Sequence, residues 1–255
     1  MHHSYIDRFA QQDSPVHRLD ARAKLLVVLA YTVVLVSFRP HQLAALAPMV
    51  IAPLALLWVG MVPVGFALKR AAVLCPFVLV LAMTAPVYDR TSVDVTLGPW
   101  HWAVAGGWLT TASILAKFVM GILALTALMC TTPFSLLLEA MRRLGLPRLL
   151  VMNLAFLYRY IFVLIDEAMR VRRARDFRGA ARAPVRRRLA AAGGVIGALF
   201  ARTIDRSQRV HLAMLARGYD GQSRTLSRLQ WNAADTVFVL AAAAYLVVCR
   251  WGLNT

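Results

Sequence analysis

The chain has 255 residues, of which 60% are hydrophobic, and its formal net charge at pH 7 is +17. A soluble domain rarely reaches this hydrophobic fraction, so the composition argues against a soluble enzyme and indicates an integral membrane protein. The positive charge alone would suggest nucleic acid as a partner, but 19 of the 29 basic residues lie between positions 131 and 230. Membrane topology is therefore the first explanation for the charge. Three cysteines, none in a CxxC pair, fit a reduced or lipid-embedded setting.

Hydropathy predicts five membrane spans, since a crossing helix needs roughly 20 mainly apolar residues. The predicted spans are 25–38 with its flanks, 42–62, 71–87, 103–130 and 233–250. The second contains Pro48 and Pro53, which neighbouring helices can tolerate. The fourth contains Lys117, whose ammonium group either faces the bundle or a partner, or extends to the interface. A short polar hairpin with aromatic side chains, YDRTSVDVTLGPWHW, separates the third span from the fourth.

Loop charges predict the orientation of the chain. Basic residues gather in the N-terminal arm, in the loop at 69–70 and in 131–230, and the positive-inside rule places all three in the cytoplasm, with the C-terminus outside. Segment 149–165 is apolar but has arginines on both sides, so we interpret it as a helix along the bundle or the interface that continues into the basic stretch. The predicted fold is an all-α integral membrane protein. Its parts are an N-terminal arm with four transmembrane helices (1–130), a cytoplasmic domain of amphipathic helices (131–230) and a C-terminal transmembrane helix (231–255).

The cytoplasmic segment contains two predicted helices that each end in an Arg-Gly pair. The first runs from Asp166 to Arg178 and Gly179, with Pro184 shortly after. The second ends in HLAMLARGYDG, which contains Ala216-Arg217-Gly218. Glycine just past a helix end can adopt the left-handed cap conformation, and a cation in the last turn complements the helix dipole.

An arginine before a capping glycine commonly does no more than stabilise a helix end. Two such ends in one cytoplasmic segment of a membrane protein favour a binding role instead. The guanidinium group offers five donors in a fixed geometry, which suits a groove lined with carboxylates on a soluble partner.

These motifs resemble those of the transmembrane T-component of energy-coupling factor (ECF) transporters, in particular the CbiQ branch associated with cobalt or nickel uptake. The resemblance covers nearly the whole chain. Its motifs are SPVHRLDARAKLL, the Thr131-Thr132-Pro133 junction with LLEAMRRLGLP, LYRYIFVLIDEAMRVRRARDFRG and AMLARGYDG, followed by a last membrane helix.

The resemblance implies that the two Arg-Gly ends belong to coupling helices that dock on a pair of ABC-type ATPases. The second family motif matches Ala216, Arg217 and Gly218 without change. The first matches Phe177, Arg178 and Gly179, with Phe177 where the family often has alanine. The nearby pair Ala174-Arg175 is the second choice for this first motif.

The same resemblance implies a non-catalytic subunit of a cobalt transporter in the bacterial inner membrane, with nickel as the alternative cargo. ATP and Mg²⁺ would bind to the partner ATPases, and the metal to a separate substrate-capturing membrane subunit. This chain itself would bind no cofactor or metal. The sequence has no GxxxxGK[ST] phosphate loop, HExxH or nucleophile-elbow motif, so no catalytic residue is assigned.

Other residues admit simpler interpretations. His2, His3, Asp7 and His17 could suggest a metal site, but sequence alone does not bring ligands together, and a mobile cytoplasmic arm is the simpler prediction. Glu139 is predicted to form helical ion pairs with Arg142 and Arg143.

Two functions of other classes remain as alternatives. A self-contained secondary transporter would need more polar residues along a pathway at the membrane midplane than Lys117 alone. A membrane-anchored binder of nucleic acid or anionic lipid would use the basic segment 131–230, but that segment has the periodicity of structured helices.

Overall fold

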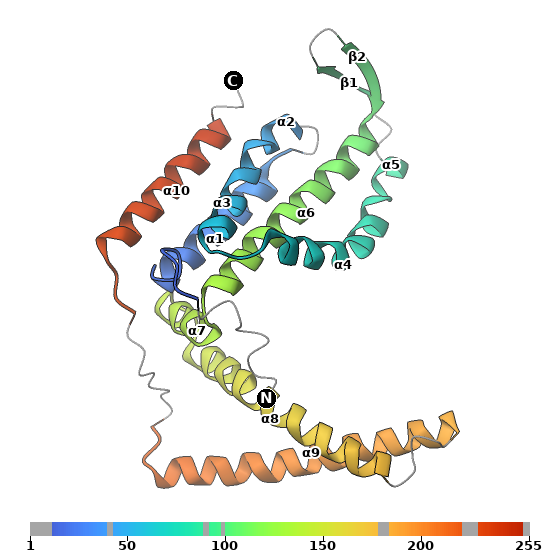
Figure 1. Ribbon diagram of the computed structural model, residues 1–255, viewed down its shortest axis with the longest axis vertical. Helices are drawn as coiled ribbons and strands as arrows, with labels where there is room; N and C mark the ends of the chain where they lie inside the picture. Colours follow the sequence, from blue (N-terminus) through green and yellow to red (C-terminus); the bar gives the residue numbers. More distant parts are fainter. Residues whose placement is uncertain are drawn as a thin grey trace. The chain divides into compact units, whose positions relative to one another are not determined.

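The computed structural model describes residues 12–39, 43–88, 92–97, 100–177, 184–220 and 229–251. These form two compact units, the first containing Met1–Leu144 and Ser227–Thr255 and the second Gly145–Leu226. In chain order the elements are α1 (Ala21–Ser37), α2 (Leu43–Leu46), the 3-10 helix η2 (Pro48–Val50), α3 (Ile51–Val59), α4 (Val64–Ala82), α5 (Ala85–Tyr88), β1 (Ser92–Leu97), β2 (Trp100–Ala105), α6 (Gly106–Thr131), α7 (Phe134–Arg143), α8 (Arg148–Phe177), α9 (Val185–Ala216) and α10 (Ala233–Trp251). Figure 1 shows both units. The predicted all-α membrane fold is confirmed, with one two-stranded hairpin added to it.

The first unit is a helical bundle in which α6 contacts α1, α3, α4 and α5, and α1 also packs on α7 and α10. Its core is built from buried apolar side chains of α1, η2, α6 and α10, which include Leu35, Met49, Met120 and Leu246. The Tyr31 hydroxyl donates to the Met49 carbonyl at 2.9 Å, which joins α1 to η2. Helix α7 belongs to this bundle, although the sequence prediction placed it in the segment 131–230.

Four helices of the described residues are long and apolar enough to cross a membrane: α4, α6, α8 and α10. Helix α10 matches the last predicted span, 233–250, to within one residue. Helix α1 covers most of the first predicted span, and with 17 residues it is slightly shorter than the roughly 20 that a crossing needs. Helix α8 contains the segment 149–165, and its 30 residues continue into the basic stretch as predicted.

The predicted second span, 42–62, is not one helix. It divides into α2, η2 and α3, and the continuous part, Pro48–Val59, is too short to be a full span. The prolines explain the division. Pro48 begins the 3-10 turn and Pro53 lies in the first turn of α3. Backbone N–H groups in the first turn have no partner within the helix, so a proline there removes no helical hydrogen bond.

Helix α4 begins at Val64, seven residues before the predicted start at 71. The sequence prediction places Lys69 and Arg70 in the loop before the span, but both lie inside the helix. The Arg70 guanidinium lies 5.4 Å from the ring centre of Phe66, one turn earlier, so an aromatic face accommodates this cation within the helix. The start of the predicted fourth span also moves, because residues 100–105 form β2 and α6 begins at Gly106.

A close approach at Gly60 explains how α3 ends against α6. A Cβ atom at this position would lie 2.7 Å from the Leu56 carbonyl oxygen and 2.9 Å from Cγ2 of Thr131. Only glycine fits without a backbone shift. The end of α3 can therefore lie directly against the end of α6.

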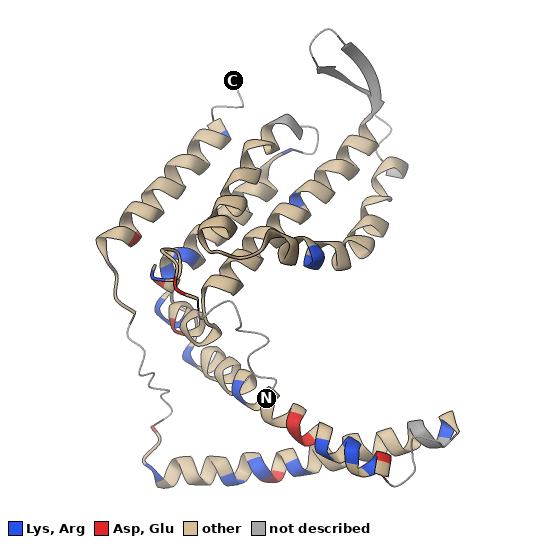
Figure 2. Ribbon diagram, viewed as in Figure 1, with Lys and Arg blue, Asp and Glu red and all other residues tan. Residues whose placement is uncertain are grey.

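The second unit consists mainly of the two long helices α8 and α9, which cross each other (Figure 1). The chain after α9 returns to the beginning of α8, where the Tyr219 hydroxyl donates to the thioether of Met152. Arginines recur along α9 and along the C-terminal half of α8 (Figure 2).

Candidate functional site

Helix α9 ends in the glycine cap that the sequence predicts. Gly218 has a φ of +76°, in the left-handed region. The Gly218 amide donates to the Leu215 carbonyl at 2.9 Å and the Tyr219 amide donates to the Met214 carbonyl at 3.1 Å. This pair of bonds is the Schellman motif, which satisfies carbonyls that a helix end leaves free. Arg217 is the C-cap residue, and its side chain is exposed.

The end of α8 is described as far as Phe177, whose side chain is 91% exposed. Arg178 and Gly179 lie outside the described residues. Ala174 and Arg175, the second choice for the first motif, lie within α8 and line its crossing with α9. The Ala174-Arg175 pair lies inside α8, and the assignment of the first motif to Phe177-Arg178-Gly179 stays a prediction.

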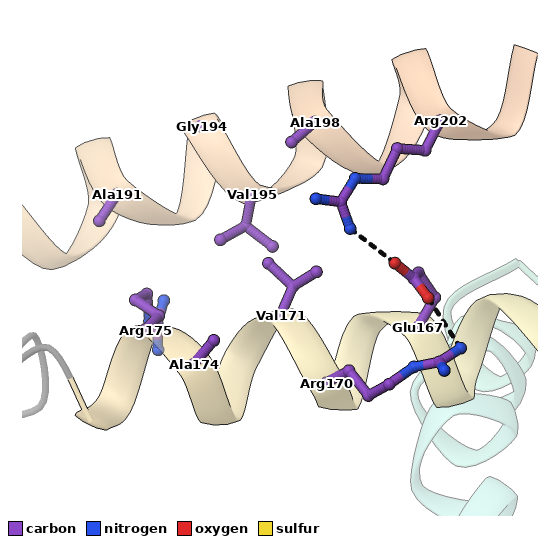
Figure 3. Close-up of a pocket in the computed structure, with 10 residues that line it drawn as sticks. All are labelled: Glu167, Arg170, Val171, Ala174, Arg175, Ala191, Gly194, Val195, Ala198 and Arg202. Carbon is purple, nitrogen blue, oxygen red and sulfur yellow. Dashed lines mark hydrogen bonds and ion pairs between the residues drawn. The ribbon is translucent and has the colours of Figure 1, made fainter. Parts of the chain in front are cut away.

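The crossing itself is held by an ion pair that sequence reasoning missed. Glu167 of α8 accepts a hydrogen bond from Arg202 of α9 at 2.7 Å and forms an ion pair with Arg170, one turn along α8, at 2.8 Å (Figure 3). A glutamate within an arginine-rich helix was the available signal, but its partner on another helix cannot be found from local spacing.

Small side chains surround the crossing point. Ala174 of α8 and Ala191, Gly194 and Ala198 of α9 line a cavity of about 530 Å³ between the two helices (Figure 3). Val171 and Val195 point toward one another across it. The contact between these helices is therefore narrow, with one ion pair and a few apolar side chains.

Both helices carry large apolar side chains that are exposed in the described part of the second unit. On α8 they include Leu149, Leu157 and Ile161, and on α9 Phe200 and Leu212. Several large apolar side chains exposed on the same two helices favour contact with lipid or with another protein. The amphipathic helices are thus exposed along their apolar side chains as well as at the Arg217 end.

The remaining predicted residues lie in the bundle. Glu139 is buried in α7 and binds Arg142 at 2.6 Å and Arg143 at 3.0 Å, which confirms the predicted ion pairs. The hydrogen bonds from Arg142 lower the pKa of the Glu139 carboxyl below its ordinary value. The ammonium of Lys117 donates to the Phe38 carbonyl at 2.6 Å, so this side chain faces the bundle and caps the end of α1.

Of the residues considered for a metal site, His17 alone lies in the described part of the chain. One of its ring nitrogens is 2.7 Å from the Ser14 hydroxyl and the other 3.3 Å from the Cys130 carbonyl oxygen. The contact with Cys130 holds the N-terminal segment against the end of α6, and the contact with Ser14 orients the ring. His2, His3 and Asp7 lie outside the described residues.

Comparison with known proteins agrees with these features over almost the whole chain. The family model CbiQ, described as cobalt transport protein, matches residues 12–227. The chain is 30% identical to the energy-coupling factor transporter transmembrane protein EcfT of Bacillus selenitireducens over 94% of this chain and 95% of that protein. It is 28% identical to EcfT of Bacillus subtilis, over 96% and 97% of the two chains, and 27% identical to EcfT of Lacticaseibacillus paracasei, over 95% and 97%. The names of these relatives specify no transported substrate. The chain thus belongs to the CbiQ family and is the transmembrane component of an ECF transporter.

Proposed function

We propose that this chain couples ATP hydrolysis in partner ATPases to the movement of a substrate-capturing membrane subunit, and that the cargo is a cobalt ion. In this role Arg178 and Arg217 anchor the ends of α8 and α9 on an ABC-type ATPase dimer. Closure of the dimer shifts one helix relative to the other. The helices transmit this shift to the substrate-capturing subunit.

The end of α9 is the observation that carries this proposal. Arg217 is exposed at a helix end that two backbone hydrogen bonds fix in place. A fixed backbone lets a guanidinium group engage carboxylates of a partner without a large loss of conformational freedom. An anchor that transmits force needs this rigidity, because a frayed end would absorb the motion.

The exposed apolar side chains of α8 and α9 support a second partner. A membrane subunit that rests on these helices would cover Leu157, Phe200 and Leu212, which are exposed here. The narrow α8–α9 contact also suits helices that change their mutual angle, because few interactions must be broken.

The chemistry of transport belongs to the partners in this proposal. ATP and Mg²⁺ bind to the ATPases, the cobalt ion binds to the substrate-capturing subunit, and this chain is non-catalytic. The complex lies in the bacterial inner membrane, with the N-terminus and residues 131–230 in the cytoplasm. The description of the family as cobalt transport proteins supports cobalt as the cargo.

The anchor role is tested by Arg217→Ala, alone and with Arg178→Ala, in the complete complex. Arg209→Ala is the matched control, since Arg209 is another exposed arginine of α9 that is distant from its end. We expect Arg217→Ala to leave membrane insertion intact and to reduce both co-purification of the ATPases and uptake, while Arg209→Ala retains both. Normal uptake by the double variant at matched expression would contradict the proposal.

The cargo is tested by uptake of Co²⁺ and Ni²⁺ into proteoliposomes that contain the complete complex. ATP-dependent Co²⁺ uptake that excess Ni²⁺ does not abolish supports cobalt, and the reverse result identifies a nickel transporter. Metal flux through this chain without any partner would instead support a self-contained transporter.

A further inference from the structure

A single buried carboxylate joins the beginnings of α1 and α10. Asp235, in the first turn of α10, is 1% exposed. Its Oδ2 accepts from the Asn232 amide at 2.8 Å, which closes the start of α10. Its Oδ1 accepts from the Asp20 amide at 2.7 Å, and Asp20 is the N-cap residue of α1. Both oxygens of one side chain are therefore bonded to backbone groups of two different helices.

The N-terminal segment also binds the end of α6. Lys24, 4% exposed, donates from its ammonium group to the carbonyl of Thr131, the last residue of α6, at 2.9 Å. Asp20 and Asp235 both lie close enough to attract the Lys24 charge. We call the backbone amide of Asp20, the side chains of Lys24 and Asp235 and the carbonyl of Thr131 the polar clasp. It connects α1, α6 and α10 at one end of the bundle.

Burial of three charged side chains is not required for stability alone. Taking such groups out of water costs several kcal/mol each, and apolar replacements of similar volume are often as stable. What a fully bonded buried network provides is one defined arrangement of the elements that it joins.

The clasp lies where the chain leaves the bundle for the second unit and where it returns. After Thr131 the chain continues through α7 to Leu144, the last residue before Gly145–Leu226. After that unit the chain re-enters the bundle at α10, whose first turn contains Asp235. One covalent connection of the second unit thus follows α6 by way of α7, and the other leads into α10, so the clasp joins a helix on each side of that unit.

We propose that the polar clasp is a rigid tie that makes α1, α6 and α10 move as one block when α8 and α9 are displaced. The inference rests on the proposed coupling function. Without the tie, only the shared apolar core resists a pull through α7 or through the segment before α10 that acts to separate α6 from α10. With it, the same displacement acts on the whole bundle. The clasp residues are positioning residues and contact neither ATP nor the cargo.

Asp235→Asn tests the tie, with Asp20→Asn as the matched control. An amide nitrogen cannot accept a hydrogen bond, so the Asp235→Asn side chain loses one of the two bonds to backbone amides. Asp20→Asn removes the same charge beside Lys24 but keeps the backbone amide that bonds to Asp235. Asparagine is as good an N-cap residue as aspartate, and within the described part of the chain the second oxygen of Asp20 makes no hydrogen bond.

The first measurement is amide hydrogen exchange in the purified complete complex, which needs no knowledge of the cargo. We expect the amides of Asp20 and Asn232 to exchange slowly with and without ATP. In Asp235→Asn we expect at least one of them to exchange about tenfold faster, as the loss of one bond to a charged group implies. Faster exchange of the wild-type amides on ATP binding would show that the clasp opens during the cycle and would overturn the rigid tie.

The second measurement is Co²⁺ uptake per ATP hydrolysed by the same complexes in proteoliposomes. We expect Asp235→Asn to keep its bound ATPases but to transport about tenfold less per ATP, and Asp20→Asn to stay within about twofold of the wild type. Wild-type uptake per ATP in Asp235→Asn, despite its faster exchange, refutes the proposal. Equal losses of uptake per ATP in Asp235→Asn and Asp20→Asn also refute the proposal. They would show that the defect comes from the lost negative charge and not from the lost hydrogen bond of Asp235.

If the complex with Asp235→Asn does not assemble, two substitutions at another clasp residue, Lys24→Met and Lys24→Arg, test the rigid tie. Methionine cannot donate to the Thr131 carbonyl, whereas arginine can, so uptake per ATP should fall with methionine and recover with arginine. If Lys24→Arg does not restore uptake per ATP, the hydrogen bond from residue 24 to the Thr131 carbonyl has no role in transport. The two proposals are distinguishable because Arg217→Ala is expected to release the ATPases, and clasp variants are expected to retain them.

Discussion

The left-handed cap at Gly218 allows one prediction to be worked out in full. In Gly218→Ala the new Cβ meets no atom within 4 Å, so steric contact adds nothing to the free-energy cost of the substitution. The cost is that of holding an alanine at a φ of +76°, about 1–2 kcal/mol. A change of this size lowers the population of the closed helix end by a factor of about 5–30.

The assay is amide exchange at residue 219, whose N–H bonds to the Met214 carbonyl only in the closed cap. We expect it to exchange about 5–30-fold faster in Gly218→Ala. Gly218→Asn should lie between alanine and the wild type, because asparagine tolerates the left-handed region better than other side chains. Uptake by the complete complex should fall in the same order if Arg217 must be held by a fixed helix end.

Gly193→Ala is the control, with the same chemical change in the interior of α9. Its Cβ also meets nothing within 4 Å, but the helical backbone there suits alanine, so we expect the helix to gain up to about 1 kcal/mol. Exchange at residue 219 should not change. If Gly218→Ala leaves that exchange rate at the wild-type value, the cap bonds do not hold the end of α9 and our account of the Arg217 anchor is wrong.

Three further predictions concern ion pairs and a half-buried lysine. Because hydrogen bonds from Arg142 lower the pKa of Glu139, its stabilising effect is present above the unfolded-state pKa and is lost as the pH falls through the lower folded-state value. Thermal unfolding measured against pH should therefore lose part of its acid sensitivity in Glu139→Gln, and an unchanged profile would contradict this. Lys117→Met removes a half-buried cap from the end of α1 and should destabilise the detergent-solubilised protein by about 1–3 kcal/mol, so an unaltered melting temperature would refute the contact. For Glu167 and Arg202, a double-mutant cycle on thermal unfolding should give a coupling energy of no more than about 1 kcal/mol, since this pair is largely exposed, and a much larger value would mean that it is shielded from water.

Features set by local chemistry were predictable from the sequence. The boundaries of α10 follow from an apolar run between Asp235 and Arg250, and the end of α9 follows from the glycine after Arg217. The ion pairs of Glu139 follow from helical spacing. The prediction of one span at 42–62 from hydropathy was wrong. There the helix boundaries depend on Pro48 and Pro53, each of which lies in the first turn of a helix.

The contacts that organise the two units could not be read from local patterns. Asp20 and Asp235 are separated by 215 positions, and Lys24 and Thr131 by 107. Periodicity reports on one helix face and contains no information about which other helix meets it. Asp20 and Asp235 did carry a partial signal, since each is an acidic residue at the beginning of an apolar helix, but only the fold brings them together.

The bond between Asp20 and Asp235 has a consequence for biosynthesis. A ribosome makes α1 before α10, so the carboxylate that receives the Asp20 amide does not exist until 215 further residues have been translated. Contacts of such high sequence separation form late and leave partly folded chains exposed in the meantime. Helix α1 therefore lacks one of its hydrogen-bond partners until α10 has been made. A nascent chain that stops before α10 exposes the surface that α10 would cover to membrane proteases and chaperones.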